Sequence, residues 1–494
     1  MKKFSLSVLM VGLLLIFCAV DFKGTRVSAN NAVQSETKRW IVIFHQPGSI
    51  PTGGRESVAA AGGTVTAELP EIGVLAATSS NPDFATEIAK NQKVDEVTED
   101  MEMQFIPTAE QMHAQAVDPS AVGTGPVEPP GSDTQTGPDP FYNPFQWDKK
   151  RIRASNQGSY AVQQGRPEVV VAVLDTGAQI LPSPHPDLQG NLDVARSRSF
   201  FPVQANPNGD PNPAAWDDRN GHGSHCMSNV GAPINGIGMV GVAPRVRLVA
   251  LKVLGDNGSG SFVSLAQALI YAGNNKFDVA SMSLSGYIRR NDQSSHILIK
   301  FVQRAIDYAR SNGVTPVAAL GNDGFNVSDG DFFRDFITVP AEVNGVIGVS
   351  ATGYTNQKAG YSNYGVGKTD VSAPGGDFGT GPAPHFGLVV GAWAPDSTTL
   401  PGAVYALAQG TSMACPQASG VCALIISQFG DFTPDNSKKI HMSPQQVEAI
   451  LQQTANNQPC PDVYVVPTQT CQGNAGYNNF YGKGIIDALK AVTE

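Results

Sequence analysis

The chain lacks a second long apolar run, an excess of positive charge and any internal repeat, and each absence narrows what it can be. After the first 29 residues, no stretch approaches the roughly 20 apolar residues of a membrane-spanning helix. The formal net charge of −10 at pH 7 argues against nucleic acid as a partner. The 52 glycines and 35 prolines favour a loop-rich α/β protein over a helical bundle.

Cysteine is also scarce, with six in the chain and the first, Cys18, inside the N-terminal apolar run. Cys460 and Cys471 bracket a short segment near the C-terminus, so a local disulfide is the simplest interpretation in an exported protein. The remaining three fall in segments with helical character and are expected to be buried, unreactive thiols: Cys226, Cys415 and Cys422.

The N-terminus has the pattern of a secretory signal peptide. Lys2 and Lys3 precede an apolar core from Val8 to Val20, and Val27-Ser28-Ala29 supplies the small residues of a cleavage site. We therefore expect residues 1–29 to be removed and the rest to be secreted, extracellular, monomeric and without a stable membrane anchor.

Three short motifs occur in the order Asp, His, Ser. Asp175-Thr176-Gly177 ends the apolar run 169–174, which predicts a buried strand with Asp175 at its carboxyl end. His222 lies in Asn220-Gly221-His222-Gly223, and Ser412 opens a helix-like stretch in Gly410-Thr411-Ser412-Met413. A serine hydroxyl is a weak nucleophile, so it needs a base and a group that orients the base. Ser412, His222 and Asp175 can supply these three roles.

Each motif alone has a simpler interpretation. Asp175 could be a turn residue, Ser412 a helix cap, and His222 with His225 a metal pair, although the glutamate of the zinc-protease signature is absent. The rival hydrolase motif Gly-x-Ser-x-Gly fails because Ala414 replaces its second glycine. The conjunction of the three motifs in one order favours the catalytic interpretation.

These motifs resemble those of subtilisin-like serine proteases. The resemblance implies a doubly wound α/β fold, with a mainly parallel sheet flanked by helices, and polypeptide substrates. Asn322, in Gly321-Asn322-Asp323-Gly324, matches the family's side-chain oxyanion donor, although alone it is only a turn residue. Two further stretches match the edges that pair with an extended substrate. They contain Gly258, Ser259 and Gly260, and Ser283, Leu284, Ser285 and Gly286, and otherwise would be ordinary loops.

A structural calcium ion is implied by a second resemblance. His185-Pro186-Asp187-Leu188 and the loop 233–239 match the two halves of the strong calcium site of subtilisins. Side-chain oxygens would come from Asp187 and Asn235, and carbonyl oxygens from the list Pro233, Ile237 and Met239, a set of hard ligands that suits Ca²⁺. The alternative is an Asx turn at each aspartate or asparagine.

The segment 30–105 resembles the inhibitory propeptide of subtilisins, a small α+β domain of ferredoxin-like shape with Glu99-Asp100 near its end. An accessory binding domain is the alternative. Residues 106–140 are dominated by proline, glycine, serine, threonine and alanine, which predicts a linker that buries no core, with the maturation cleavage in it or just before it. The catalytic domain would span 141–494, and its basic run Lys149-Lys150-Arg151 would be a solvated helix start.

The predicted function is therefore a secreted serine endopeptidase, made as an autoprocessed precursor that its own propeptide inhibits. Two alternatives stay open: a dedicated maturation protease for one partner precursor, and a catalytically silent binding protein. The insertions 206–218 and 376–401 rim the expected cleft, so substrate range is the property least safely inferred from the resemblance.

Overall fold

The computed structural model of the chain describes residues 36–117, 129, 135–203, 206–328, 335–381, 387–432 and 440–494. The predicted signal peptide lies outside these residues, and so does much of the predicted linker. The description below concerns Thr37–Glu494, which form one structural unit.

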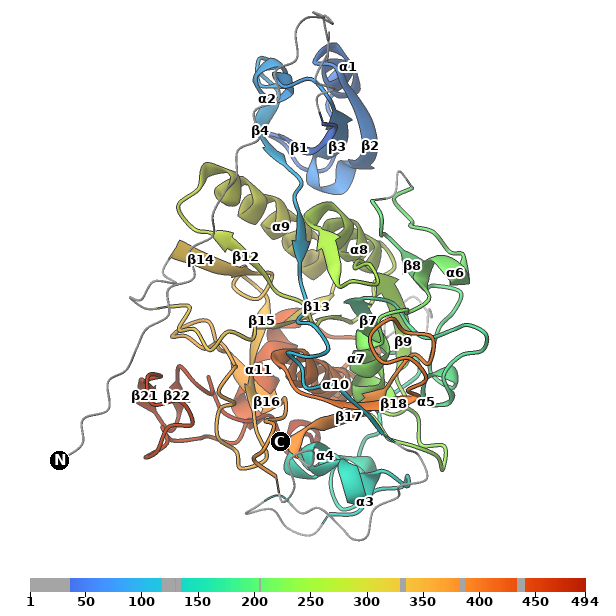
Figure 1. Cartoon of the computed structure of the whole chain (residues 1–494), viewed down its shortest axis with the longest axis vertical. Helices are drawn as coiled ribbons and strands as arrows, with labels where there is room; N and C mark the ends of the chain where they lie inside the picture. The colour runs from blue at the N-terminus through green and yellow to red at the C-terminus, as the bar shows by residue number, and fades with distance from the viewer. Residues whose placement is uncertain are drawn as a thin grey trace, which may run out of the picture. The chain divides into compact units, whose positions relative to one another are not determined.

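A seven-stranded sheet lies at the centre, and every pair of its neighbouring strands is parallel (Figure 1). The strands lie in the order β16-β15-β13-β11-β7-β9-β8. Their bounds are β7 Val170–Asp175, β8 Arg198–Ser199, β9 Arg247–Lys252, β11 Val279–Met282, β13 Thr315–Ala319, β15 Ile347–Thr352 and β16 Val371–Pro374. The predicted fold class, a mainly parallel α/β sheet flanked by helices, is confirmed.

Strand β7 shows why the sheet must be covered on both faces. Val171 and Val173 belong to one buried cluster, while Val170 and Leu174 belong to another. Successive side chains of a strand point to opposite faces, so an unbroken apolar run needs helices on each side.

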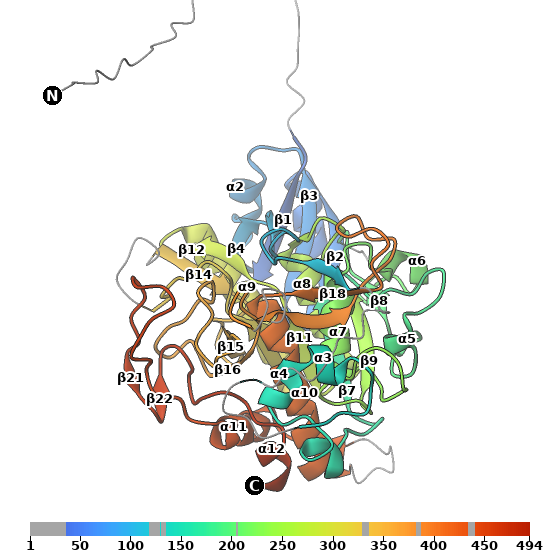
Figure 2. The same ribbon diagram turned by 60° about the horizontal axis from the view of Figure 1, so that its bottom comes forward.

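A separate layer of helices covers each face of the seven-stranded sheet (Figure 2). One layer contains α7 His222–Gly231, α10 Thr411–Phe429 and α11 Pro444–Thr454, and the other contains α8 Phe262–Asn274 and α9 Gln293–Ser311. Helix α11 begins at a capping box, in which Ser443 and Gln446 bond each other's backbone. Helix α10 begins at Thr411, so Ser412 lies in its first turn.

The small N-terminal domain is a four-stranded antiparallel sheet in the order β2-β3-β1-β4. Its elements are β1 Lys38–Phe44, α1 Gly54–Ala60, β2 Gly63–Leu69, β3 Val74–Ser79, α2 Phe84–Ile88 and β4 Val94–Glu99. This order of elements and strands is ferredoxin-like, as predicted. One face packs on α1 and α2 through Phe44 and Val58, and the other shares a buried cluster with α8 and α9 through Ile41 and Ile43.

Two short strands, one from the end of the predicted propeptide and one from the predicted linker, are built into the larger domain. Strand β5 Glu102–Gln104 pairs with β10 Ser259–Ser261, and β6 Gln115–Val117 pairs with β18 Tyr405–Ala408, which itself pairs with β17 Val389–Ala392. Met112 is 1% exposed and packs in a cluster with Met413 and Trp393. The expectation that residues 106–140 bury no core is therefore wrong for 106–117, because the hairpin β17–β18, whose first strand lies in the insertion 376–401, receives them.

The basic run before the first sheet strand also differs from expectation. Lys149 and Lys150 are fully buried in α4 Trp147–Arg151, which follows α3 Tyr142–Phe145. The Lys149 ammonium group donates to Asp148 Oδ2 at 2.6 Å and to Asn229 Oδ1 at 2.7 Å. The prediction of a solvated helix start is wrong here, because polar partners inside the fold replace water around the charge.

The remaining elements are short. They are the pair β12 Gly286–Arg289 and β14 Phe336–Val339, the pair β19 Asp431–Phe432 and β20 Ile440–His441, the pair β21 Gly473–Asn474 and β22 Tyr477–Asn478, the helices α5 Pro186–Gln189, α6 Pro213–Trp216 and α12 Lys490–Thr493, and the 3₁₀ turns Pro70–Ile72 and Ser159–Ala161. Helix α6 lies in the predicted insertion 206–218 and buries Trp216.

Candidate active site

Asp175 and His222 meet at the carboxyl end of β7. The Asp175 Oδ1 atom lies 2.8 Å from His222 Nδ1, and both side chains are fully buried. The loops that carry them approach closely, since a Cβ atom added at Gly223 would lie 2.3 Å from the Gly177 carbonyl oxygen. Glycine at position 223 therefore allows the histidine motif to pack on the Asp-Thr-Gly turn.

Asp218 holds these two loops together. Its buried carboxylate accepts hydrogen bonds from the Thr176 hydroxyl at 2.9 Å and the Gly221 backbone N–H at 2.8 Å, and also from Ser224. The sequence analysis did not single out Asp218. Only its proximity to the histidine motif could have drawn attention to it.

Ser412 enters from helix α10. It is 2% exposed, and its hydroxyl donates to the Ser283 carbonyl oxygen at 3.2 Å, while the Ser283 hydroxyl donates to the Ser412 carbonyl oxygen at 2.9 Å. Ser283, which the sequence placed among the substrate-binding residues, therefore also contacts the nucleophile's own residue. At the start of a helix, the backbone N–H groups of the first turn favour negative charge nearby.

Asn322 follows β13 and contacts the residue before Ser412. Its Oδ1 atom accepts hydrogen bonds from the Thr411 backbone N–H at 2.8 Å and the Thr411 hydroxyl at 3.1 Å. These two donors identify Oδ1 as the atom that faces Thr411, so the amide nitrogen faces away from it. Asn322 thus has a donor N–H₂ group available near the first turn of α10.

Cys226 lies one helical turn after His222, with its sulfur 3.8 Å from Nδ1 and 4.0 Å from Nε2 of that histidine. Asp175, His222 and Cys226 also form a group of the kind that can hold a metal ion. Burial raises the pKa of the Cys226 thiol well above its usual value, and raises that of Cys415 to about 11. Cys226, Cys415 and Cys422 are all free and buried, and a protonated thiol is a poor nucleophile.

The chain's own segment 102–117 runs along this site. Beyond the pairing of β5 with β10, the Phe105 N–H donates to the Gly258 carbonyl oxygen at 3.1 Å, and the Ser285 N–H donates to the Phe105 carbonyl oxygen at 2.8 Å. Five of the seven predicted substrate-binding residues contact this segment. They are Gly258, Ser259, Gly260, Ser285 and Gly286.

The Phe105 side chain fills an apolar pocket. Its ring meets Phe262 edge-on at a centroid distance of 5.4 Å, and a Cβ atom added at Gly286 would lie 2.7 Å from it. Leu284, another predicted substrate-binding residue, belongs to the same buried cluster as Leu254. The two predicted edges therefore share one apolar pocket.

A separate cavity of about 500 Å³ lies between the same segment and the nucleophile loop. Its lining includes Asn322, Asp323, Tyr361, Gly410 and Pro107. The cavity has room for a side chain beside the Asn322 amide group.

The predicted calcium loops also come together. Asp187 is fully buried, and its carboxylate accepts hydrogen bonds from Asn235 Nδ2 at 3.0 Å, from the Met239 N–H at 2.9 Å and from the Tyr405 hydroxyl at 2.8 Å. Burial raises the pKa of Asp187 to about 6, and the negative charge of Asp139 adds to this rise. The carbonyl oxygens of Pro233 and Ile237 belong to the same loop, 233–239.

Asp139 is a residue that the sequence analysis missed. One of its oxygens accepts a hydrogen bond from the Gly236 N–H at 2.7 Å, and the other is buried without a hydrogen-bond partner. Burial raises the pKa of Asp139 as well. Two buried carboxylates and a buried unpaired oxygen beside the loop 233–239 fit a divalent cation.

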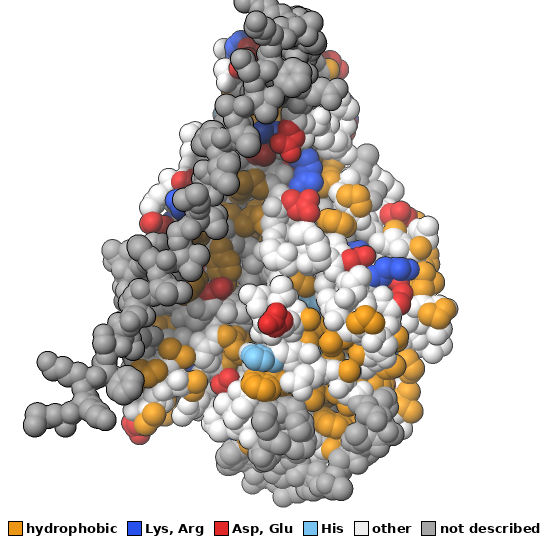
Figure 3. Space-filling model, in the orientation of Figure 1, with side chains coloured by type: hydrophobic (Ala, Val, Ile, Leu, Met, Phe, Trp, Pro, Cys, Tyr) orange, Lys and Arg blue, Asp and Glu red, His pale blue; other side chains and the backbone are white. Residues whose placement is uncertain are grey.

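The predicted disulfide between Cys460 and Cys471 is present. On the face seen in Figure 3, acidic and basic side chains are interspersed among polar and apolar ones. Within the described part of the chain, no helix has both the length and the apolar character needed to cross a membrane.

The family model that matches this chain is Peptidase S8, the subtilase family, over residues 166–484. The M-protease of Shouchella clausii (strain KSM-K16) is 34% identical over 324 residues, which cover 66% of this chain and 64% of that protein. A solved lanthipeptide protease is 25% identical with a TM-score of 0.57, covering 70% of this chain and 93% of that one.

The epidermin leader peptide processing serine protease of Staphylococcus aureus has a TM-score of 0.66 at 21% identity. It covers 93% of this chain and 98% of its own, which shows that the fold is shared. The family match includes Asp175, His222, Asn322 and Ser412. The chain therefore belongs to the subtilase family, the S8 family of serine endopeptidases.

Proposed function

We propose that this chain is a serine endopeptidase in which Ser412 is the nucleophile, His222 the general base and Asp175 the group that orients the base. The observation that carries the proposal is the buried 2.8 Å contact between Asp175 and His222 Nδ1, with Ser412 delivered by α10 beside them. With Nδ1–H donating to Asp175, the other ring nitrogen, Nε2, has the lone pair that a base needs.

The reaction follows from these positions. The Ser412 hydroxyl gives up its hydrogen bond to the Ser283 carbonyl oxygen and transfers its proton to His222 Nε2. The Ser412 oxygen then attacks the peptide carbonyl carbon. The oxyanion that forms is stabilised by the Ser412 backbone N–H and the Asn322 side-chain N–H₂. His222 then gives its proton to the departing amine, and water releases the acyl group by the same steps.

Labelling by a fluorophosphonate probe tests the assignment. The wild-type mature enzyme should be labelled and should hydrolyse casein, whereas Ser412→Ala should do neither. If folded wild-type protein were not labelled, the alternative of a catalytically silent binding protein would be favoured. The presence of all the catalytic residues argues against that alternative.

We also propose that residues 30–105 are an inhibitory propeptide. The small domain's sheet shares a buried cluster with α8 and α9, and Lys300 on α9 pairs with Asp95 at 2.6 Å and Glu96 at 2.9 Å. Strand β5 then takes the edge of β10 that a substrate would pair with. A folded domain that delivers its own tail to the cleft supports inhibition rather than an accessory binding role.

Substrate recognition is proposed to follow the same contacts. An extended polypeptide would add a strand between the 258–260 and 283–286 edges and place an apolar side chain in the pocket that Phe105 fills. Burying one large apolar side chain contributes about 1.5 to 3 kcal/mol, enough to set a strong preference.

A structural calcium ion is proposed at the loop 233–239. Asp187, Asn235 and Asp139 would supply side-chain oxygens, and the carbonyl groups of Pro233, Ile237 and Met239 would complete the set. Bound calcium would neutralise the two buried carboxylates and join the loop to the segment before α3. It has no proposed part in the chemical steps.

A narrower function, the maturation of one partner precursor, is the second candidate. Among the solved structures that resemble this chain are one titled as an epidermin leader peptide processing protease and one titled as a lanthipeptide protease. The hairpin β17–β18, whose first strand lies in the insertion 376–401, adds a wall beside the site. A peptide-library digest separates the two, because a broad endopeptidase cuts many library members and a dedicated one cuts few.

Export is proposed from the signal-like residues 1–29. Expression of the full-length Ser412→Ala chain with its native N-terminus should give unprocessed precursor in the medium, and N-terminal sequencing of that precursor should place the signal cleavage after Ala29. Retention of an uncut N-terminus in the cell would contradict it.

A further inference from the structure

The loop that carries Asn322 is held from two sides. On the side of α10, Thr411 donates twice to Asn322 Oδ1, and its hydroxyl oxygen accepts from the Gly321 N–H at 3.1 Å. On the opposite side lies Gln469, which is 7% exposed and comes from the C-terminal part of the chain. The sequence analysis gave Gln469 no role.

Gln469 ties the end of this loop to a second turn. Its Nε2 atom donates to the Gly324 carbonyl oxygen at 3.0 Å and to the Gly360 carbonyl oxygen at 2.7 Å. Gly324 itself donates to the Tyr361 carbonyl oxygen at 2.6 Å. Asn363 continues the same contact, since its Oδ1 accepts from the Asp323 N–H at 3.1 Å. Gln469 thus adds to the hydrogen bonds that join the oxyanion loop 321–324 to the turn 360–363.

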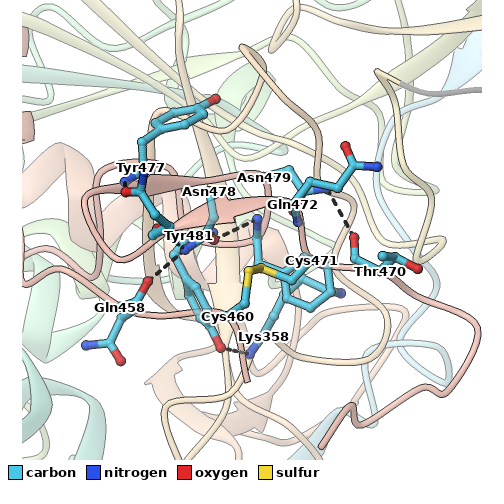
Figure 4. Close-up of a disulfide and its surroundings, with 12 residues drawn as sticks. Lys358, Gln458, Cys460, Thr470, Cys471, Gln472, Tyr477, Asn478, Asn479 and Tyr481 are labelled. Atoms are coloured by element: carbon cyan, nitrogen blue, oxygen red, sulfur yellow. Dashed lines mark hydrogen bonds between the residues drawn. A yellow bond between two sulfur atoms is a disulfide. The ribbon is translucent and has the colours of Figure 1, made fainter. Parts of the chain in front are cut away.

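The disulfide keeps Gln469 in place. Cys471 lies two residues after Gln469 and is bonded to Cys460 across a separation of 11 residues. Figure 4 shows Asn479 beside this bridge, where its side chain accepts from the Gln472 N–H at 2.7 Å and donates to the Thr470 carbonyl oxygen at 3.2 Å. The loop is otherwise open to solvent at Val463, which is 73% exposed.

We propose that Gln469, held by the Cys460–Cys471 bridge, is a positioning residue that fixes the oxyanion loop and so places the Asn322 amide group. The inference rests on the proposed role of Asn322. An oxyanion donor acts only when charge develops on the carbonyl oxygen, so a loosened loop lowers kcat and leaves KM nearly unchanged. If Gln469 served only the cavity wall at Tyr361 and Asp323, its loss would raise KM instead.

The test is a double-mutant cycle on the mature enzyme with a peptide anilide substrate, using active-site titration to count working enzyme. Gln469→Met keeps the side-chain volume and removes the donor, and Thr468→Ala, at an exposed neighbour, is the matched control. We expect Gln469→Met to lower kcat about three- to tenfold, the effect of one or two lost hydrogen bonds, with KM changed less than twofold. Thr468→Ala should leave both constants unchanged.

The second arm introduces Asn322→Ala, which should lower kcat by about a hundred- to a thousandfold, as loss of the equivalent donor does in subtilisin. In that background, Gln469→Met should lower kcat less than twofold, because the group that it positions is gone. If the two effects multiply, or if Gln469→Met changes KM alone, the positioning role is refuted. If Asn322→Ala itself leaves kcat intact, the proposed oxyanion role fails, which is a distinguishable result.

The bridge is tested separately by the pair Cys460→Ser and Cys471→Ser, and by reduction of the wild-type enzyme with a phosphine. Both treatments should lower kcat in the same direction as Gln469→Met and should add little to that variant. Reduction that leaves kcat unchanged at a temperature where the enzyme stays folded would show that the bridge does not position Gln469.

Discussion

Docking of the small domain should depend on pH through Asp100. This carboxylate lies at the start of α8, where the Val263 N–H donates to it at 3.4 Å, and Arg39 lies 3.7 Å away. Burial raises the pKa of Asp100 to about 6 in the docked state, despite the opposing effects of Arg39 and the hydrogen bonds. Once the domain has left, the side chain is exposed and its pKa returns to about 3.8.

The sign follows from linkage. The docked state holds the proton more tightly, so affinity is highest below the free pKa and is lost as the pH rises through the docked pKa of about 6. A pKa difference of two units gives about tenfold tighter inhibition at pH 5 than at pH 8, and a larger gain nearer pH 4. Release of the domain is therefore favoured as the pH becomes neutral.

The assay is inhibition of mature enzyme by the separate segment 30–105, with Ki measured between pH 5 and pH 8. Asp100→Asn mimics the protonated acid, so its Ki should vary little with pH and should stay below that of the wild-type segment between pH 5 and pH 8. Glu102→Gln is a control, because Glu102 is more exposed than Asp100. Equal pH slopes for the wild-type and Asp100→Asn segments would refute the argument.

Three further outcomes are expected. Calcium should lengthen the half-life of thermal inactivation more than it raises initial turnover, because a ligand that binds only the folded state, present at a hundred times its Kd, stabilises that state by about 2.7 kcal/mol. Asp187→Ala or Asp139→Asn should remove the effect. Equal inactivation rates with calcium and with chelator would rule the site out. Ser412→Ala and His222→Ala should accumulate as signal-cleaved precursor on a gel, and processing of pure Ser412→Ala at the normal rate would exclude self-cleavage. A peptide-library digest should show apolar residues before the scissile bond and three residues upstream, whereas cleavage chiefly after charged residues would contradict the apolar pocket.

The parts of the site that could be predicted from sequence are those with a local signature. Asp175 ends an apolar run whose length and composition fit a buried strand, so its place at a sheet edge follows from the pattern alone. His222 and Ser412 lie in short glycine-containing motifs whose order already implied the chemistry. Ser443 likewise has a capping-box partner three residues away. In each case the decisive neighbours are close in the sequence.

The missed residues have distant partners. Asp139 acts on a loop about a hundred residues later, and Gln469 bonds Gly324 across 145 residues. No periodicity or motif records such a contact, because glutamine and aspartate are ordinary in exposed loops. Lys149 also has a distant partner. A basic run is usually solvated, so the sequence predicts exposure, and only the fold brings Asn229 to the Lys149 ammonium group.

The segment 102–117 shows how composition can hide a structural role. Its apolar residues fall in short runs interrupted by Pro107 and by polar residues, so no long strand or helix is predicted; yet Phe105, Met112 and Val117 are each buried in a different cluster of the larger domain. Their spacing suits a chain that crosses a cleft, held on one side by the edge of β10 and on the other by the edge of β18. The precursor's own chain therefore occupies the β10 edge with which a substrate would pair, which supports the proposed inhibition by the segment that ends at Phe105.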